Sequence, residues 1–386
     1  MSELLESRWQ DTKQALVEGL QGNKKAVMET TLENTRKYLS ESATAGATSA
    51  GNVATLNRVI LPVIRRVMPT VIANELVGVQ PMTGPVGQIH TLRVRYSDTA
   101  NGATAGEEAL SPFKIAEAYS GNASGKADAT ASLEGQAGNR MSIQILKQTV
   151  EAKTRKLSAR WTFEAAQDAQ SMHGIDVEAE IMAALAQEIT AEIDQEVLAS
   201  LQTLAGTAAE TYDQAAVSGT ATFVGDEHAA LAVQINRVSN LIAQRTRRGA
   251  GNWAVVSPFA LTILQSATTS AFARTTEGTF EAPTNTKMVG TLNNAMKVYV
   301  NTYSADNAPV LIGYKGSSES DAAAFYCPYI PLMSSGVVLD PSTFEPVVSF
   351  MTRYGYVELT NTSSSLGNAA DYVGLVAITN GNVKFA

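Results

Sequence analysis

Residues 78–96 read GVQPMTGPVGQIHTLRVRY, and this stretch decides more about the fold than any other. Pro81 and Pro85 each fix their own φ angle and bias the preceding residue toward extended geometry, which excludes a helix. From Gln88 onward apolar and polar residues alternate, and alternation predicts a strand. The stretch is therefore a rigid, non-helical entry into a strand that ends near Tyr96.

Two later parts of the chain carry patterns that belong with this stretch. Residues 313–316 read GYKG and are followed by FYCPYIPL at 325–332, while residues 340–346 read DPSTFEP and are followed by TRYG at 352–355. Together with residues 78–96, and in this order, these segments resemble the major capsid proteins of T-even-type (myovirus) bacteriophages. The similarity covers roughly residues 52–386.

The resemblance implies an α+β chain with the HK97-like capsid fold. In that fold an N-terminal arm and an extended β-loop flank a peripheral domain built on a long spine helix, and an α/β axial domain points at the hexamer centre. The implied segments are a helical N-terminal segment at 1–41, the arm at 42–96, the extended loop at 97–149, the peripheral domain at 150–204 and 346–386, and the axial domain at 205–345.

The function implied by the resemblance is that of a head-shell protein of a tailed double-stranded DNA bacteriophage. Its hexamers would build an icosahedral or prolate head, with a vertex protein, a portal, a scaffold, a head-maturation protease and decoration proteins as partners. It would be a virion component assembled in the host cytoplasm, without enzyme activity or cofactor. The alternatives are a cellular, encapsulin-like nanocompartment shell and, from another class, an α/β hydrolase or nucleotide-binding enzyme.

The composition fits a shell subunit. Of the 386 residues 45% are hydrophobic and only 17% are charged, which suits a chain that buries much of its surface against neighbours. The net charge of −8 argues against a basic nucleic-acid-binding domain. Cys327 is the single cysteine, so the sequence predicts a reducing compartment and no intrachain disulfide. Charges interrupt Met1–Leu20, which predicts no signal peptide, and no apolar run reaches the ~18 residues that span a membrane.

The amino-acid composition of the chain changes near residue 42. Residues 1–41 are charged and helix-prone, whereas residues 42–51 contain mostly Ala, Thr, Ser and Gly and predict a flexible linker. Head proteases of the family cut after Glu in a Leu/Ile-x-Glu pattern, and Leu39-Ser40-Glu41 fits that pattern at this change of composition. The resemblance therefore predicts processing between Glu41 and Ser42, although three other segments match the same short pattern.

Helices are predicted for residues 150–202. Leu157, Trp161 and Ala165 continue one apolar stripe, and Asp176 is placed to cap a second, longer helix. The apolar residues of the longer helix recur every four residues, so its stripe winds around the axis. Either the helix is a spine that crosses several layers or it is a core helix surrounded on all sides.

The second half of the chain is predicted to be mixed. A helix with one apolar face runs from Asp226 to Arg248, Ser257-Pro258 opens another helix, and both follow cap rules. Strands are predicted at 253–256, 297–303, 309–313, 323–326 and 347–360, with a closing hairpin of 375–379 and 382–385 around Asn380-Gly381.

Candidate chemistry is weak throughout the sequence. Residues 121–127 (GNASGKA) miss the phosphate-loop spacing by one residue and lack its hydroxyl, so they predict a loop tip. His90, His173 and His228 have no second His or Cys at metal-ligand spacing. Cys327 lies between apolar and proline residues, which favours packing over nucleophilic catalysis. The sequence therefore predicts no catalytic, metal or cofactor residue.

Several charged residues are predicted to lie at contacts between subunits. Arg58, Arg65 and Arg66 could contact nucleic acid, but salt bridges between subunits are favoured because no aromatic residues are interleaved. The acidic run from Glu178 to Glu196 has no bases on its own helix, so it is a solvated face or one paired between subunits. The predicted contact residues are Arg58, Arg65, Arg66, Arg93, Arg95, Glu107 and Glu108.

Overall fold

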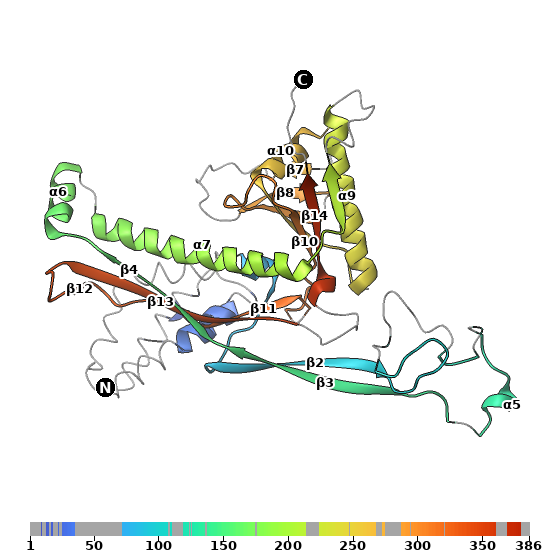
Figure 1. The fold of residues 1–386 in the computed structure, drawn as a ribbon. Coiled ribbons are helices and arrows are strands. Elements are labelled where there is room, and N and C mark those ends of the chain that lie inside the picture. The colour runs from blue at the N-terminus through green and yellow to red at the C-terminus, as the bar shows by residue number, and fades with distance from the viewer. Residues whose placement is uncertain are drawn as a thin grey trace.

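Helix α7 (Val177–Ala205) is the longest element, and the other layers are arranged along it (Figure 1). A five-stranded sheet runs beneath it, a seven-stranded sheet stands at its C-terminal end, and a two-stranded hairpin projects from the body (Figure 1). The computed structural model describes residues 9, 13–14, 17, 22, 25–34, 72–106, 109, 119–122, 124, 126–135, 137–173, 176–213, 224–246, 248–267, 272–274, 287–293, 295–319, 321–359 and 369–379.

The five-stranded sheet is organised around its longest strand, β13. β13 pairs antiparallel with β11, β12 and β4, and β1 joins parallel to β11. Along β13 buried side chains alternate with half-buried ones, because one face packs into the core shared with α7. The strands are β1 (Gly78–Val79), β4 (Lys153–Arg160), β11 (Ala324–Ser334), β12 (Val338–Leu339) and β13 (Pro346–Glu358).

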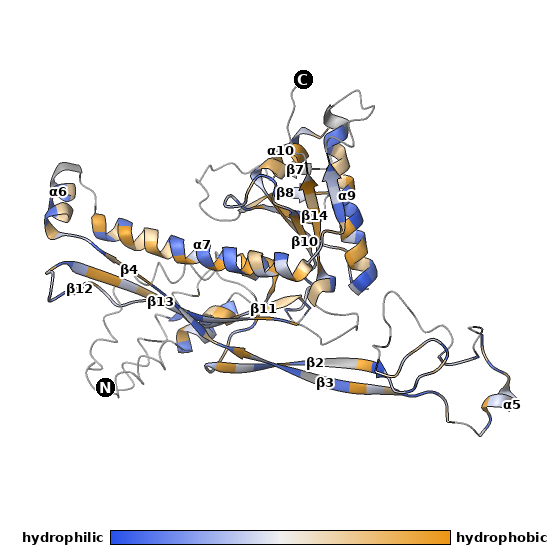
Figure 2. Ribbon diagram, viewed as in Figure 1, coloured by the Kyte–Doolittle hydropathy of each residue, from blue (hydrophilic) through white to orange (hydrophobic). Residues whose placement is uncertain are grey.

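The seven-stranded sheet has the order β5-β14-β10-β6-β9-β8-β7. Helix α9 (Val224–Thr246) packs against β5, β10 and β14, and Figure 2 shows apolar and polar residues alternating along it. The strands are β5 (Glu210–Asp213), β6 (Trp253–Val256), β7 (Phe272–Arg274), β8 (Lys287–Leu292), β9 (Met296–Val300), β10 (Val310–Gly313) and β14 (Val373–Thr379).

Several predictions in this half are confirmed. The predicted apolar face of α9 is buried, including Leu231 and Ile235 at 0% exposure. Ser257 caps α10 (Pro258–Ser266), because its hydroxyl accepts a hydrogen bond from the Ala260 amide at 3.2 Å. The second arm of the predicted terminal hairpin, 382–385, lies outside the described residues.

The hairpin consists of β2 (Val86–Tyr96) and β3 (Met141–Glu151), which pair antiparallel along their whole length. β2 confirms the strand predicted from the opening stretch. The remaining short helices are α4 (Ala73–Leu76), α5 (Thr130–Leu133), α6 (Phe163–His173) and the 3₁₀ turn η2 (Ala369–Tyr372).

The prediction that residues 150–202 are helical is wrong at its start. β3 continues to Glu151 and β4 occupies 153–160, before α6 and α7 begin. In β4 the half-buried Arg155, Leu157 and Ala159 alternate with exposed residues, which is the two-residue period of a strand. The spacing of four from Leu157 to Trp161 fitted a helix only by coincidence.

The predicted spine helix is confirmed, and one of its two interpretations is wrong. Asp176 caps α7 by accepting hydrogen bonds from the Glu178 and Ala179 amides. Glu180, Ala184 and Glu188 are exposed, so α7 is not surrounded on all sides. It is a spine with a buried face and a solvent face.

The sheets do not follow the predicted division into 205–345 and flanking peripheral pieces. β11 lies within 205–345 but pairs with β13 of the five-stranded sheet. β14 lies within 346–386 but sits between β5 and β10 in the seven-stranded sheet. Strand pairing joins segments far apart in the chain, which the order of segments alone could not reveal.

Candidate assembly surfaces

The hairpin β2–β3 forms a separate two-stranded sheet that extends away from both larger sheets (Figure 1). Eleven residue pairs run in register from Val86 opposite Glu151 at the base to Tyr96 opposite Met141 at the far end. At the base the Ala152 amide donates to the Pro85 carbonyl at 2.9 Å. Near this base, β3 contacts β13 of the body.

A small cluster stabilises the far end of the hairpin. The rings of Tyr96 and Tyr119 have centroids 4.5 Å apart, and Ala103 and Ala109 are buried against them. The Tyr119 hydroxyl donates to the Arg140 carbonyl at 2.6 Å. Asp98 pairs with Arg140 at 3.1 Å, and hydrogen bonds from Arg140 lower the pKa of the Asp98 carboxyl. The arm thus has a local core of its own, far smaller than those of the two sheets.

One face of β3 exposes an apolar stripe, which we call the hairpin stripe and which comprises Met141, Ile143 and Ile145. These side chains are 54%, 67% and 66% exposed. They recur every second residue, so all three lie on the same face of the strand. Large apolar side chains gathered on one exposed face mark a surface that another molecule covers.

The opposite face of the hairpin carries the one predicted contact residue whose side chain the structure describes. Arg95 lies opposite Ser142 and is half-buried, and its buried Nε has no hydrogen-bond partner among the described residues. The side chain of Arg93 lies outside the described part. So do the predicted contact residues Arg58, Arg65, Arg66, Glu107 and Glu108 and the processing residues Leu39, Glu41 and Ser42.

The acidic face of α7 is corrected by the structure, because part of it pairs within the chain. Arg155 of β4 binds Glu192 at 2.7 Å and Glu196 at 2.5 Å, and the Tyr354 hydroxyl also donates to Glu196. Burial would raise the pKa of Glu196, but the hydrogen bonds from Arg155 and Tyr354 outweigh it and the pKa is lowered. Arg155 was missed as a partner because residues 150–160 were predicted to be helical.

Asp194 of the same helix is almost completely buried, with 1% exposure. Its Oδ1 accepts the Ile72 amide at 2.9 Å, and its Oδ2 has no partner among the described residues. Burial raises the pKa of this carboxyl to about 7, and the Ile72 hydrogen bond opposes the shift. Asp194 thus joins the spine to the start of α4, a role no sequence pattern indicated.

The described part of the N-terminal segment packs into the main core. Residues 25–34 are helical, and Val27, Met28 and Leu32 are buried with side chains of α7 and β13. The side-chain amide of Asn34 donates hydrogen bonds through Nδ2 to the backbone carbonyls of Met82 at 2.6 Å and Tyr329 at 2.9 Å. This helix is therefore an integral part of the body.

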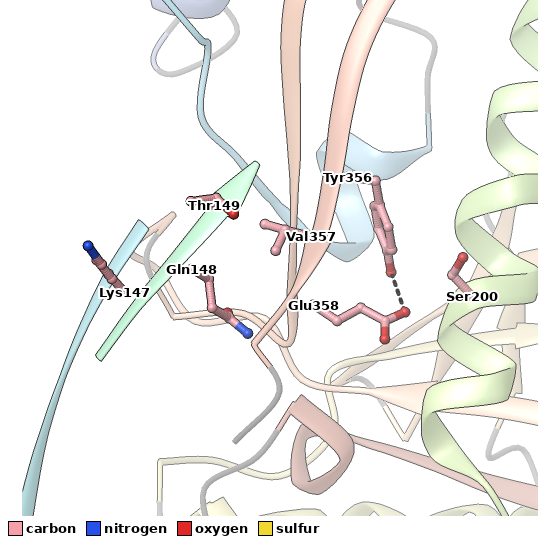
Figure 3. A pocket seen from close by; sticks show the side chains of 7 residues that line it. All are labelled: Lys147, Gln148, Thr149, Ser200, Tyr356, Val357 and Glu358. Carbon is pink, nitrogen blue, oxygen red and sulfur yellow. Dashed lines mark hydrogen bonds between the residues drawn. The ribbon is translucent and has the colours of Figure 1, made fainter. Parts of the chain in front are cut away.

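A groove lies where the hairpin, α7 and β13 meet (Figure 3). It is lined by Lys147, Gln148, Thr149, Ser200, Tyr356, Val357 and Glu358. The Tyr356 hydroxyl donates to Glu358 at 3.4 Å, whereas Lys147 points away from this pair. Burial raises the pKa of Glu358 despite the hydrogen bond from Tyr356. The groove marks the place where the arm leaves the body.

Cys327 and His228, which the sequence analysis considered as catalytic or metal-binding candidates, are packed inside the fold. Cys327 is buried, and burial raises the pKa of its thiol to about 12, which confirms a packing residue. His228 Nδ1 lies 2.5 Å from the Ser266 hydroxyl, and burial lowers its pKa. Within the described ranges no three His, Cys, Asp or Glu residues group around a common point. None of the described helices has the length and apolar character to cross a bilayer.

A spine helix on one sheet, a second sheet at its end and a projecting arm with an exposed apolar stripe are an arrangement typical of a structural subunit. The family model for the major capsid protein Gp23 matches residues 53–133 and 113–378. The chain belongs to this family of phage major capsid proteins, and it is a structural component of a tailed-phage capsid.

Two sequence relatives and one solved structure illustrate what the chain is similar to. The major capsid protein of Vibrio phage KVP40 is 30% identical over 421 aligned residues, which cover 84% of this chain and 81% of that protein. That of Enterobacteria phage T4 is 29% identical, covering 82% and 78%. A chain of the mature capsid of bacteriophage PhiM1 has a TM-score of 0.46 at 13% identity, covering 78% of this chain and 84% of that chain. The family model and the relatives at 29–30% identity confirm the prediction of a phage major capsid protein.

Proposed function

We propose that this chain forms hexamers that tile an icosahedral or prolate phage head around double-stranded DNA. The hairpin carries the proposal, because it projects from the body and exposes the stripe of Met141, Ile143 and Ile145. A two-stranded sheet without a covering layer is marginally stable in water. Burying the stripe under a neighbouring subunit would stabilise the arm and join the two subunits in one step.

The two sheets suit different places in such a hexamer. We assign the seven-stranded sheet with α9 and α10 to the axial domain at the hexamer centre. The five-stranded sheet and α7 form the peripheral domain in this proposal. The spine links the two, since α7 contacts both β4 and β14.

The charge of the chain suits a container wall. Its net charge of −8 disfavours tight binding to phosphates, so we propose that it encloses DNA without gripping the phosphates or reading the sequence. The partners of the proposed particle are a vertex protein, a portal, a scaffold, a head-maturation protease and decoration proteins. We place its assembly in the host cytoplasm, consistent with a single, buried cysteine.

Electron microscopy of the purified chain tests the proposal, with hexamers, tubes or closed shells as the expected result. The double variant Ile143→Ser/Ile145→Ser should remain a folded subunit and lose these assemblies. The matched control is Ser142→Ala/Gln144→Ser, which alters exposed residues on the other face of the same strand and should still assemble. A wild-type chain that stays monomeric under all assembly conditions contradicts the proposal.

Deleting Gly102–Gly138 tests the same arm at its far end. The deletion removes most of the extended loop and leaves seven residues, 97–101 and 139–140, to join β2 to β3. The thermal transition of the subunit should stay normal, because none of the described residues of this loop belongs to the hydrophobic clusters of the body. Closed shells should be lost. Shells of ordinary stability would show that the extended loop does not hold neighbours together.

We also propose that a head protease cuts between Glu41 and Ser42. Removing residues 1–41 would take Val27, Met28 and Leu32 out of the core, so the cut would loosen the free subunit and favour stabilisation by neighbours. Intact mass of the subunit from DNA-filled particles decides the matter. A chain beginning at Ser42 supports the cut, and a chain beginning at Met1 or Ser2 contradicts it.

A further inference from the structure

One short segment touches the spine helix and both sheets. This segment is residues 72–79, which include α4 and β1 and which we call the strap. The Ile72 amide donates to Asp194 of α7 at 2.9 Å, and β1 pairs in parallel with β11 of the five-stranded sheet. Lys297 of β9, in the seven-stranded sheet, lies 3.7 Å from Glu75 of the strap. The strap therefore joins the spine to both sheets.

The apolar side chains of the strap pack into the core that the two sheets share. Ala73 and Val77 are 0% exposed and Leu76 is 1% exposed. They belong to the same cluster as Tyr299 of β9 and Tyr326 of β11. Side chains packed this closely have few alternative arrangements, so an element placed among two sheets restricts how the sheets can move relative to each other.

The strap is fastened at the place where the chain crosses from one sheet to the other. The connection from β10 of the seven-stranded sheet to β11 of the five-stranded sheet carries Lys315 and Glu319. Lys315 Nζ donates to the Asn74 carbonyl at 2.7 Å and lies 3.2 Å from Glu319 Oε2. The same carboxylate oxygen accepts the Val79 amide at 3.0 Å. One ion pair on the crossover thus holds both α4 and β1.

This fastening is shielded from water. The side chain of Lys315 is only 13% exposed and that of Glu319 is 31% exposed. Gly78 permits the close approach, because a Cβ atom there would lie 2.3 Å from the Glu319 carbonyl oxygen and 2.8 Å from the Phe325 ring. Hydrogen bonds from a charged donor are stronger than neutral ones, and low exposure reduces their screening. The contact is therefore stronger than an ordinary surface ion pair.

Three of the sequence motifs described above meet at this fastening. Gly78 begins the first motif, Lys315 lies in the second at 313–316, and β11 contains the third at 325–332. The strand register places Gly78 directly opposite Phe325. The motifs are far apart in the chain, and their meeting gives each of them a part in one junction.

We propose that the strap sets the angle between the two sheets and that Lys315 is the residue that fastens it. The spine and the crossover are continuous chain and cannot detach, whereas the strap is held by side-chain contacts that can open. A subunit that is repeated in a particle needs its two sheets at a defined angle. The inference concerns the free subunit and goes beyond the proposed hexamers, so the two can fail separately.

The variant Lys315→Met tests the strap, because it keeps a long side chain and removes the charged donor. Hydrogen exchange in the peptide 72–80 should become about tenfold faster or more. The distance distribution between spin labels at Val233→Cys on α9 and Thr154→Cys on β4 should broaden. Both label positions are exposed and Cys327 is buried, so the labels attach only where they are intended.

Two further variants separate the role of the strap from a general loss of stability. Ile263→Val removes a methylene from the completely buried side chain on α10, in the other core cluster, and should lower stability without changing the distance distribution. Glu319→Gln keeps an acceptor for the Val79 amide and removes only the charge opposite Lys315. It should give the same changes as Lys315→Met to a smaller extent, and it provides the test if Lys315→Met does not fold.

Three results overturn the inference. The first is unchanged exchange and unchanged distances in both strap variants. The second is faster exchange with unchanged distances, because Lys315 would then fasten the strap without setting the angle. The third is an equally broad distribution in Ile263→Val, because the angle would then follow overall stability. Failure of the wild-type chain to assemble contradicts the proposed function instead and leaves these measurements on the subunit unaffected.

Discussion

The seven-stranded sheet and the hairpin β2–β3 both contain large aliphatic residues, but the sheet buries them and the hairpin exposes them. Val298 and Ile312 in the sheet are completely buried, in one cluster with side chains of α9 and α10. Ile143 and Ile145 in the hairpin are two-thirds exposed. The core of the sheet is complete within one subunit, whereas the apolar stripe of the hairpin would be covered only by the neighbour that we propose.

This difference allows the free energy of subunit folding to be measured separately from the free energy of subunit association. Side chains in the sheet contribute to folding of the subunit, and side chains on the hairpin stripe should contribute only when subunits associate. Mutations in the two regions should therefore be read out by different experiments, and the predictions below use that contrast.

The largest effect is expected for Ile235→Ala on α9. Its side chain is completely buried, so the free energy of unfolding should fall by about 2–5 kcal/mol in urea titrations. Ile145→Ala removes the same atoms from an exposed strand and should change subunit stability by less than ~0.5 kcal/mol, while weakening assembly. Equal losses in the free subunit would mean that the hairpin stripe is a core surface.

The buried carboxyl of Asp194 should make subunit stability depend on pH. Its folded pKa of about 7 lies above the unfolded value near 3.9, so its contribution is greatest below pH ~4 and is lost as the pH rises to about 7. Asp194→Asn keeps the acceptor for the Ile72 amide and should stabilise the subunit at pH 8 by up to ~4 kcal/mol. At pH 4 the two proteins should be nearly equal, and an identical pH dependence would contradict the buried charge.

Trp161→Ala should have an intermediate effect. A fully buried tryptophan would cost about 3–5 kcal/mol on truncation. Trp161 is half-buried against the core below α7, so we expect a loss of roughly 1–2 kcal/mol in thermal or urea unfolding. A loss above ~3 kcal/mol would indicate that the ring belongs to the closed core of the body.

The smallest effect is expected for Arg155→Gln, at about 1 kcal/mol, because its partners Glu192 and Glu196 are partly exposed. The loss should appear in the free subunit, since these ion pairs lie within the chain. Arg160→Gln, which removes a mostly exposed guanidinium at the end of the same strand, is the control and should be near neutral. A loss seen only in assembled particles would restore the original interpretation of a face paired between subunits.

The features that could be predicted from the sequence are those that depend on residues close together in the chain. The cap at Ser257, the cap at Asp176 and the apolar face of α9 each depend on spacings of a few residues, and all are confirmed. The family motifs gave the capsid class for the same reason, since they are contiguous stretches.

The features that could not be predicted depend on distant pairing. β4 was mistaken for a helix because Leu157 and Trp161 fit both periods, and its partner β13 lies almost 200 residues away. The link from Asp194 to the Ile72 amide likewise joins segments that no local pattern connects. The hairpin stripe is different, because Met141, Ile143 and Ile145 recur every second residue, and this alternation alone predicts a strand with one apolar face.

The interleaved strand order has a consequence for synthesis of the chain. β14, near the end, lies between β5 and β10, so the seven-stranded sheet cannot close until residue 379 has left the ribosome. Asn34 must wait for a carbonyl 295 residues further on. From the end of β5 at residue 213 to the end of β14 at residue 379, synthesis at 5–20 residues per second takes roughly 8–33 s, and the edge of β5 stays unpaired for that time. Chains that lack β14 would leave the facing edges of β5 and β10 unpaired, and unpaired strand edges favour aggregation.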